Sequence, residues 1–309
     1  MNRSFSMARV LTTLLLAGGI GALAACNGSG GTSSTGSMSL AVTDTPVDSA
    51  QSVVVAFTGV TLHGPNGTRT ITFSKEKTMN LLSLQGNASA SLLPNTTVDA
   101  GQYQWIRLNL DLANSYIVTD TGAQYPLSVP SGSQSGLKLV SGFTVAQGSQ
   151  MNFVIDFDLR KSLTMAQNGS SGSVKYILKP ALRLINMQQV GSIAGYAAPT
   201  MTINGEAISN TSCSPAVYVY SGTNVTPAGY AVTTSGGATP LTSATLKLDN
   251  STGNYDYTVG FLAPGGYTLA ATCAANDTTS PSAATLAFSV PANAAVLVNA
   301  TTSVNFPVQ

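Results

Sequence analysis

Charged residues are scarce in this sequence. Only 8% of its 309 residues are Asp, Glu, Lys or Arg, whereas such residues make up roughly 25% of an ordinary globular protein. Removal of residues 1–25 would leave 11 basic against 12 acidic residues, so the chain lacks the basic surface of a nucleic-acid-binding protein. The single histidine excludes a zinc site made of several histidines. We expect no nucleic-acid partner.

The usual sequence signatures of an active site are missing as well. There is no Gly-Lys-Ser/Thr phosphate-binding loop and no Cys-x-x-Cys pair. In SGSQSG (131–136) the outer glycines flank Gln134 instead of a serine, so the spacing of a nucleophile elbow fails. His63 ends an apolar run at a Gly-Pro turn without a recognisable catalytic partner, and we expect it to line that turn. The sequence therefore predicts neither an enzyme nor a cofactor.

No apolar run is long enough for a transmembrane helix. Arg3 and Arg9 are followed by an uncharged run over residues 10–25, a length of 16 residues. A helix needs roughly 20 residues to cross a bilayer. A basic start, a short apolar run and small residues at its end instead predict a secretory signal peptide.

The end of this run is more specific. Leu-Ala-Ala-Cys at 23–26 resembles a bacterial lipobox, in which the cysteine thiol receives diacylglycerol and its new amine receives a further acyl chain such as palmitate. We expect residues 1–25 to be a lipoprotein signal peptide, cleaved between Ala25 and Cys26, and Cys26 to anchor the chain in a membrane. Asn27 replaces the Asp of inner-membrane retention, which favours the outer membrane. An ordinary signal peptide or an uncleaved anchor are the alternatives.

Two further features are typical of an exported protein. Residues 26–37 are rich in Gly, Ser and Thr without a large apolar side chain, which predicts a flexible tether. The remaining cysteines, Cys213 and Cys273, form an even pair, and in an oxidising compartment we expect a disulfide between them. Two separate buried thiols are the alternative.

Short alternating or β-branched runs occupy the body of the chain. They lie at 39–44, 52–64, 68–74, 103–112 and 151–160, whereas 80–86 fits either a helical turn or a strand end. In the run 151–160 the odd positions are apolar from 153 onward, and the opposite face carries Asp156, Asp158 and Arg160. This pattern predicts an all-β fold of two tandem β-sandwich domains, Ig-like or prealbumin-like.

The charge balance changes near Val190. Residues 27–190 hold 10 basic and 8 acidic residues, and beyond them only Lys247 opposes four acids. We therefore expect domains over 38–190 and 191–309. The segments DAGQYQWIRLNL (99–110) and APGGYTLAATCA (263–274) share an order of turn, glycine, one residue, tyrosine and strand. This repeat predicts similar architecture in both domains, with tyrosine rings that are buried and hydroxyl groups that cap the next strand.

Six separated phrases carry a family resemblance. They are VTDTPVDSAQSVVVAFTGVTLH (42–63), MNLLSLQG (79–86), DAGQYQWIRL (99–108), LKLVSGFTV (137–145), VIDFDLRKSL (154–163) and YILKPALRLI (176–185). Their order and spacing resemble the bacterial domain-of-unknown-function family 4382, found in exported lipoproteins, which carries no catalytic residues to transfer. GSIAGY (191–196) and NYDYTVGFLAPGGYTLAATC (254–273) resemble carboxypeptidase regulatory-like or transthyretin-like sandwiches. That resemblance implies a structural or binding module.

Four acids are candidates for a cation site. Asp156 and Asp158 share a strand face, and Asp44 and Asp48 flank a Thr-Pro turn that could approach them. Oxygen clusters of this kind can hold calcium, but a solvated face with ion pairs to the adjacent cations is the favoured interpretation.

Aromatic residues could form a surface that stacks on sugars or peptides. Two sets stand out, Tyr103, Trp105, Tyr116 and Tyr125, and Tyr218, Tyr220 and Tyr230. Tyr103 and Trp105 have the same strand parity, which predicts a shared face, although core packing is the favoured role for both sets.

The function expected from the sequence is non-catalytic. We expect binding, adhesion or scaffolding in the bacterial envelope, with a membrane contact through the N-terminal lipid and a polysaccharide or protein ligand. One alternative is an enzyme acting on envelope polysaccharide through Asp156 or Asp158, and another is a fibre subunit whose C-terminal strand is donated to a neighbour.

The lipid anchor predicts the behaviour of a Cys26→Ala variant. Because only the cysteine supplies the acylated thiol, the variant should lose both lipoprotein processing and membrane fractionation. Membrane fractionation and the mass of the processed chain measure this, and an unchanged result in both would contradict the lipobox interpretation. Protease treatment of intact cells then separates a surface location, where the protein is digested, from a periplasmic one, where it is protected.

Overall fold

The computed structural model describes residues 34–45, 47, 50–130, 136–167, 174–230, 237–273 and 286–306. Cys26, the signal peptide and most of the expected tether therefore lie outside the described residues. The first strand begins at Thr35, so residues 35–37 of the expected tether belong to a strand. Residues 33–309 form one compact unit.

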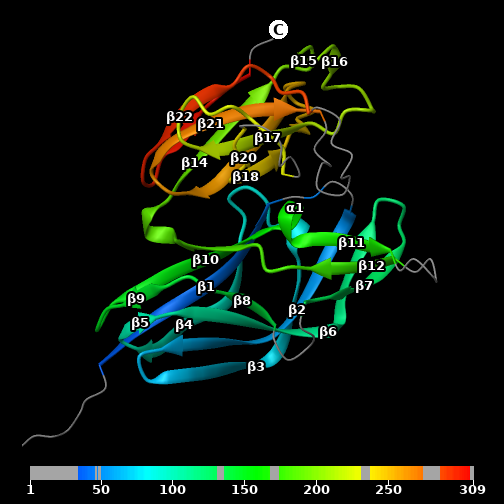
Figure 1. The fold of residues 1–309 in the computed structure, drawn as a ribbon. Coiled ribbons are helices and arrows are strands. Elements are labelled where there is room, and N and C mark those ends of the chain that lie inside the picture. The colour runs from blue at the N-terminus through cyan, green and yellow to red at the C-terminus, as the bar shows by residue number, and fades with distance from the viewer. Residues whose placement is uncertain are drawn as a thin grey trace, which may run out of the picture. The chain divides into compact units, whose positions relative to one another are not determined.

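The first half of the chain is a β-sandwich (Figure 1). One sheet has the order β13 (Leu182–Asn186), β10 (Gln150–Asp158), β1 (Thr35–Thr45) and β4 (Ala90–Asp99). The other has the order β11 (Leu163–Gln167), β12 (Val174–Leu178), β7 (Gln124–Ser128), β6 (Trp105–Thr119), β2 (Ala50–Gly64) and β3 (Gly67–Asn80), with β8 (Leu137–Leu139) also on β6. A small sheet joins β5 (Gly101–Tyr103) and β9 (Phe143–Val145).

Apolar side chains from both large sheets fill this sandwich. Leu40 on β1 and Phe157 on β10 lie in one core with Phe57 on β2 and Leu108 on β6, and all four are fully or almost fully buried. β1 pairs in parallel with β10 and antiparallel with β4. The alternation of apolar residues that predicted these strands is thus the alternation that builds the core.

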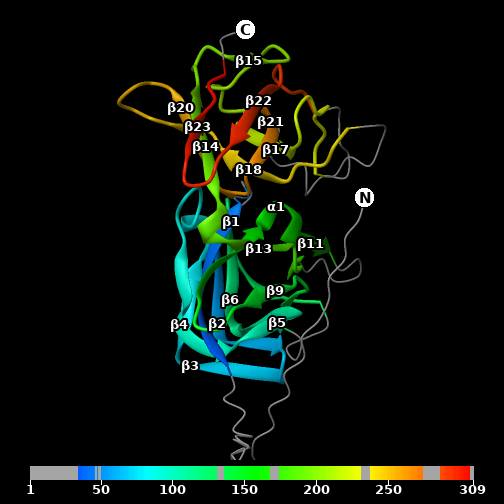
Figure 2. The same ribbon diagram turned by 90° about the vertical axis from the view of Figure 1, so that its left-hand side faces the viewer.

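The second half of the chain is another β-sandwich (Figure 2). One sheet has the order β19 (Lys247–Leu248), β20 (Tyr255–Leu262), β14 (Gly191–Ala197) and β23 (Thr301–Ser303). The other has the order β18 (Thr242–Thr245), β17 (Ala216–Ser221), β21 (Gly265–Thr272) and β22 (Ala292–Val296). A short hairpin joins β15 (Thr202–Ile203) and β16 (Glu206–Ala207).

Helical structure is minimal in the described residues. It comprises α1 (Leu159–Ser162) and the 3-10 turns η1 (Leu81–Ser83) and η2 (Met187–Gln189). The ambiguous segment 80–86 therefore contains a helical turn, and the expected strand 151–160 ends at Asp158. None of the described helices is long and apolar enough to span a bilayer. The prediction of a nearly all-β protein with two β-domains is confirmed.

The repeated glycine–tyrosine segment forms the same corner in both domains. Tyr103 and Tyr267 are buried, and each hydroxyl donates a hydrogen bond to the carbonyl oxygen of the residue four positions earlier, at 2.8 and 2.7 Å. The preceding glycines, Gly101 and Gly265, have φ angles of 140° and 155°, which disfavour other residues. This is a tyrosine corner, in which the hydroxyl pins a turn to the start of a strand.

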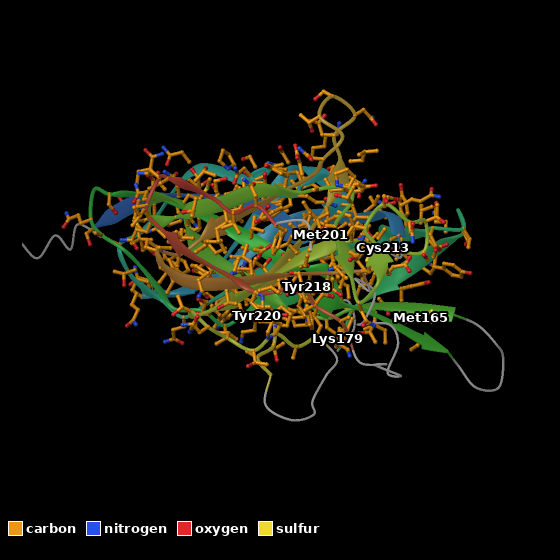
Figure 3. The ribbon with its side chains drawn as sticks, turned by 90° about the horizontal axis from the view of Figure 1, so that it is seen from above. Met165, Lys179, Met201, Cys213, Tyr218 and Tyr220 are labelled. Carbon is orange, nitrogen blue, oxygen red and sulfur yellow. A yellow bond between two sulfur atoms is a disulfide. The ribbon has the colours of Figure 1, made fainter. Side chains whose placement is uncertain are left out.

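The expected disulfide is present between Cys213 and Cys273. The two Cα atoms are 4.6 Å apart, and Cys213 belongs to the core of the second sandwich. Figure 3 labels Cys213 together with Tyr218 and Tyr220 of the neighbouring strand β17. The bond closes a loop of 60 residues that includes β17, β18 and β20.

Removal of this disulfide should destabilise the second domain. A Cys213→Ser, Cys273→Ser double variant frees a loop of 60 residues in the unfolded chain, and the expected loss is about 4 kcal/mol in the chain-entropy model. Urea unfolding of the parent and the variant measures the difference. Equal midpoints and slopes would contradict a structural role for this bond.

Candidate functional site

Three of the four candidate acids meet where β1 and β10 end. In the parallel register Thr43, Asp44 and Thr45 lie beside residues 156, 157 and 158. Asp44, Asp156 and Asp158 are only 3–4% exposed. Asp48 lies outside the described residues. The prediction that the Thr-Pro turn brings Asp44 toward the strand acids therefore agrees with the register, but the expected solvated face is wrong because this end of β10 is buried on both faces.

Two of these carboxylates are held by cations. Asp156 accepts hydrogen bonds from Arg183, including one from Nε at 3.0 Å, and its other oxygen lies 3.4 Å from Thr45 Oγ1. Asp158 caps α1 by accepting a hydrogen bond from the Lys161 amide at 3.2 Å, and it pairs with Lys161 Nζ at 3.1 Å. Burial raises the pKa of Asp158, and Lys161 opposes the rise.

Asp44 is different because no hydrogen bond of normal geometry reaches either carboxylate oxygen within the described residues. Burial first, and then the charges of Asp156 and Asp158, raise the pKa of Asp44 well above its ordinary value, while Arg160 and the Leu159 amide oppose the rise. The carboxyl group lines a cavity of about 20 Å³, room for about one water molecule. This cavity is too small for a sugar or peptide.

The second domain covers these charges. Arg160 is 1% exposed and donates from Nε to Ser243 Oγ at 2.9 Å. The Lys161 ammonium donates to the Pro240 carbonyl at 2.8 Å, and the Thr45 hydroxyl lies 2.8 Å from the Thr242 hydroxyl. We call this set of contacts, formed by residues 44–45, 156–161 and 240–243 with Arg183, the polar junction.

The calcium hypothesis stays a prediction. In the part of the chain that the structure describes, no group of three or more His, Cys, Asp or Glu side chains is arranged to hold a metal ion. Asp156 and Asp158 already have cationic partners.

The aromatic residues separate into buried and outward-facing groups. Tyr103, Tyr218 and Tyr220 are 4% exposed or less. Tyr103 stacks on Phe143, whereas Trp105 stacks on His63, so the expected common face is wrong. The cause is a break in the strand at residue 104, between β5 and β6. Because residues 103 and 105 belong to different strands, their even spacing no longer places them on the same face.

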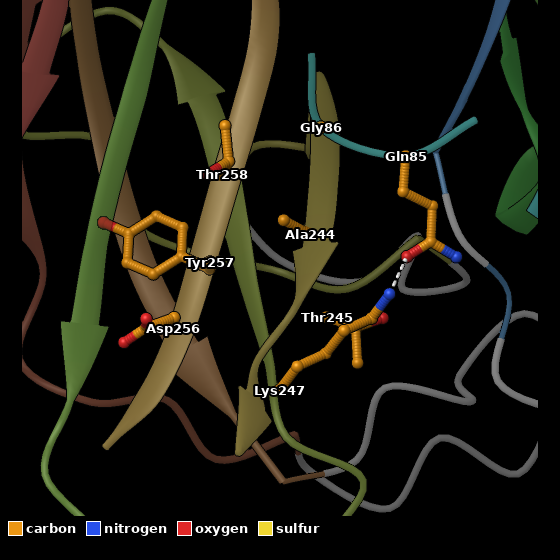
Figure 4. Close-up of a pocket in the computed structure, with 8 residues that line it drawn as sticks. All are labelled: Gln85, Gly86, Ala244, Thr245, Lys247, Asp256, Tyr257 and Thr258. Carbon is orange, nitrogen blue, oxygen red and sulfur yellow. Dashed lines mark hydrogen bonds between the residues drawn. The ribbon is translucent and has the colours of Figure 1, made fainter. Parts of the chain in front are cut away.

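A groove of about 250 Å³ lies beside the polar junction (Figure 4). It is lined by Gln85 and Gly86 of the first domain and, from the second, by residues 244, 245, 247 and 256–258. Lys247 Nζ donates to Gln85 Oε1 at 2.8 Å across the groove. Lys247 is also the register neighbour of Asp256, but no ion pair joins them, and the Asp256 carboxylate has no hydrogen-bond partner within the described residues.

A second groove of about 420 Å³ continues over the same sheet. It shares Asp256 and Thr258 with the first groove and extends across β14 to Ser303 and Asn305. Asp256 lies directly opposite Tyr196, a residue that is 40% exposed. Opposed residues of an antiparallel pair project from the same face. We call the outward side of β19, β20, β14 and β23 the outer face.

Tyr196 is the functional candidate that sequence reasoning missed. Among the described residues it is the one aromatic residue that ranks as exposed, at 40%. The segment GSIAGY was part of a family resemblance, but the position of Tyr196 on an outward face follows from its pairing with both β20 and the C-terminal segment. The sequence does contain one signal for this position. In GSIAGYA the alternation places Tyr196 on the same face as Ala194 and opposite to the apolar Ile193.

The family comparison covers the first sandwich. Residues 35–180 match the family model described as "Domain of unknown function (DUF4382)". These residues form a DUF4382 domain. The match includes the acids of the polar junction and both ends of β2, and it begins at the residue where β1 begins. It stops before β13, although β13 completes a sheet of the DUF4382 domain by pairing with β10.

Comparison with curated proteins found no match. Among solved structures, a leucine-rich repeat protein from Bacteroides thetaiotaomicron is 15% identical at a TM-score of 0.24, with 89% of this chain and 26% of that one covered. A minor pilin of Streptococcus agalactiae is 9% identical at a TM-score of 0.19, with 87% and 94% covered. A suggested cell adhesion protein of Bacteroides fragilis is 8% identical at 0.21, with 84% and 82% covered. The chain spans about a quarter of the length of the first of these.

The unpartnered carboxyl of Asp44 predicts that removal of this ionisable group stabilises the folded protein, by an amount that depends on pH. Because its pKa in the folded state lies above the ordinary 3.8, ionisation of Asp44 costs stability as the pH rises above about 4, up to the folded-state pKa. Asp44→Asn should therefore raise the melting temperature at pH 7.5, by the equivalent of at least about 1 kcal/mol, and the gain should shrink toward pH 4.

The matched control is Asp156→Asn, which removes a carboxylate that has a cationic partner. This variant should lower the melting temperature at pH 7.5 because it leaves Arg183 without its partner. Thermal unfolding followed by circular dichroism measures both. A gain for Asp44→Asn that does not change with pH would contradict the proposed cause.

Proposed function

We propose that this chain is a non-catalytic glycan-binding protein of the bacterial envelope, and that the outer face of the second domain is its binding surface. The observation that carries the proposal is the exposure of Tyr196 beside the free carboxylate of Asp256 on a grooved sheet face. The flat C–H side of a sugar ring stacks on an aromatic ring, while its hydroxyl groups need hydrogen-bond partners nearby.

Polar groups are placed around Tyr196 in the way that such a ligand requires. Asp256 offers a carboxylate that can accept from sugar hydroxyl groups, and Thr258 and Ser303 lie one row further along the sheet. Ala194 separates these two residues in that row. Its small side chain leaves a flat floor next to the Tyr196 ring. The two grooves together favour an extended chain over a compact ligand.

The enzymatic alternative has less support. Hydrolysis of a glycosidic bond needs two carboxyl groups about 5–9.5 Å apart across the substrate. Asp256 is the only acid among the described residues that line the two grooves. Asp156 and Asp158 are buried and paired with Arg183 and Lys161. Neither could act on a polymer in solvent without breaking its pair.

The fibre alternative needs a C-terminal strand that is free for donation. Here β23 pairs with β14, Phe306 is 2% exposed, and the Tyr257 hydroxyl donates to the Val304 carbonyl at 2.8 Å. This segment already completes the second sandwich up to residue 306. The envelope location rests on the disulfide, which is typical of oxidising compartments, and on the lipobox-like sequence at 23–26.

The proposal predicts that Tyr196→Ala weakens glycan binding. Affinity electrophoresis of the full chain in gels that contain dextran, mannan or xyloglucan, and pull-down on peptidoglycan sacculi, identify a bound glycan. For that glycan the variant should show a Kd about tenfold higher, equivalent to about 1.4 kcal/mol. Leu297→Ala is the matched control, because Leu297 is an exposed apolar residue, 65% exposed, that lines neither groove.

Two outcomes would overturn the proposal. One is equal binding by the parent and Tyr196→Ala, which would place any ligand elsewhere. The other is shortening of the bound glycan during incubation, measured by size-exclusion chromatography, which would identify an enzyme.

A further inference from the structure

The only tryptophan and the only histidine of the chain lie together with two cations on the first domain. Trp105 begins β6, and its ring stacks on His63 of β2, with centroids 5.2 Å apart and planes 7° apart. Arg107 Cζ lies 5.1 Å and Lys138 Nζ 4.4 Å from the Trp105 ring centroid. We call these four residues the Trp105 cluster.

Register and burial show that the cluster faces away from the core. Its strands β8, β6 and β2 are neighbours in one sheet (Figure 1). Trp105 lies opposite His63, and Arg107 opposite Lys138. The alternating residues Ile106 and Leu108 are fully buried, so the cluster occupies the other side of the sheet. Lys138 is exposed, and the other three are partly exposed.

The charges of this cluster have no counter-charge. Within the described residues neither the Arg107 nor the Lys138 side chain makes an ion pair or a hydrogen bond, and Arg107 Nε is buried without a partner. Like charges directly opposite on neighbouring strands repel each other. The Trp105 ring attracts both cations, but it carries no negative charge. In a chain with only 8% charged residues, this pairing of two cations is not explained by the surface composition.

We infer that the Trp105 cluster binds the carboxylate groups of an acidic polysaccharide. The guanidinium of Arg107 matches a planar carboxylate through paired hydrogen bonds, and the Lys138 ammonium adds a second charge. Polar side chains continue along the same face at Asn109, which is partly exposed, and Thr68, which is exposed, and this suits a ligand rich in hydroxyl groups. Two cations around one ring fit one carboxylate per sugar better than the dense phosphates of a nucleic acid.

The single tryptophan makes this site directly measurable. Because Trp105 is the only indole, a change in tryptophan fluorescence of the full chain reports on this cluster alone. Titration with polygalacturonate should give a saturable change that weakens as salt is added, and neutral dextran should give none. An Arg107→Gln, Lys138→Gln double variant should raise the apparent Kd for polygalacturonate by about tenfold or more.

The matched control is Arg69→Gln, Lys77→Gln, which removes the same charge from two cations of β3 outside the cluster. This control should keep the Kd of the parent, and unchanged melting temperatures would show that both double variants are folded. Tyr196→Ala should also leave the polygalacturonate Kd unchanged, so this inference and the glycan site of the second domain can fail separately.

Several outcomes would overturn the inference. They are no fluorescence response to polygalacturonate, an equal loss of affinity in the Arg69→Gln, Lys77→Gln control, and an equal response to dextran. Tighter binding of dextran sulfate would assign the cluster to sulfate groups instead. Tighter binding of duplex DNA or of vesicles containing phosphatidylglycerol would assign it to phosphate groups of another class of partner.

Discussion

The arrangement of the second domain on the first depends on burial of charge at the polar junction. Removal of an ion from water costs several kcal/mol in a protein interior, and this cost is offset only when partners of good geometry are supplied. Arg160 and Lys161 receive such partners from Ser243 and Pro240 of the second domain. The DUF4382 domain alone would lack these partners, so Arg160 and Lys161 at its polar end need the second domain to complete their hydrogen bonds.

The grooves of the outer face follow from this docking. Gly260 of β20 approaches the first domain so closely that a Cβ atom there would lie 2.4 Å from the Gly86 carbonyl oxygen. The same approach places Gln85 within 2.8 Å of Lys247. Because Lys247 is held by Gln85, it does not neutralise Asp256, and that carboxylate stays available beside Tyr196. A packing constraint between two domains thereby sets the electrostatics of a surface on one of them.

Sequence reasoning was successful where the signal is local. The alternation of apolar residues predicted β1, β2 and β10, and the even number of remaining cysteines predicted the Cys213–Cys273 bond. The glycine–tyrosine repeat predicted buried tyrosine rings in both domains, and both contain them, but each hydroxyl bonds to the carbonyl four residues earlier and does not cap the next strand. Each of these signals is complete within about a dozen residues or within a simple count.

The sequence could not predict features that arise between distant segments. Asp156 and Asp158 were expected on a solvated face, because nothing in 151–160 shows that residues 240–243 will cover that end of the strand. Tyr103 and Trp105 have the same parity, yet one residue between β5 and β6 separates a core ring from an outward one. A single break in a strand is enough to reverse a face, and composition gives no sign of it.

The scarcity of charge makes the remaining charges informative. Hydroxyl and amide side chains carry most of the polar surface of this chain, so its few cations are not needed for solubility alone. At the polar junction each cation has an acid, hydroxyl or carbonyl partner that accounts for its position. Arg107 and Lys138 have no such partner, although they lie opposite each other across two strands. Their mutual repulsion lowers the stability of the free protein. An anionic ligand bound between them would remove this repulsion.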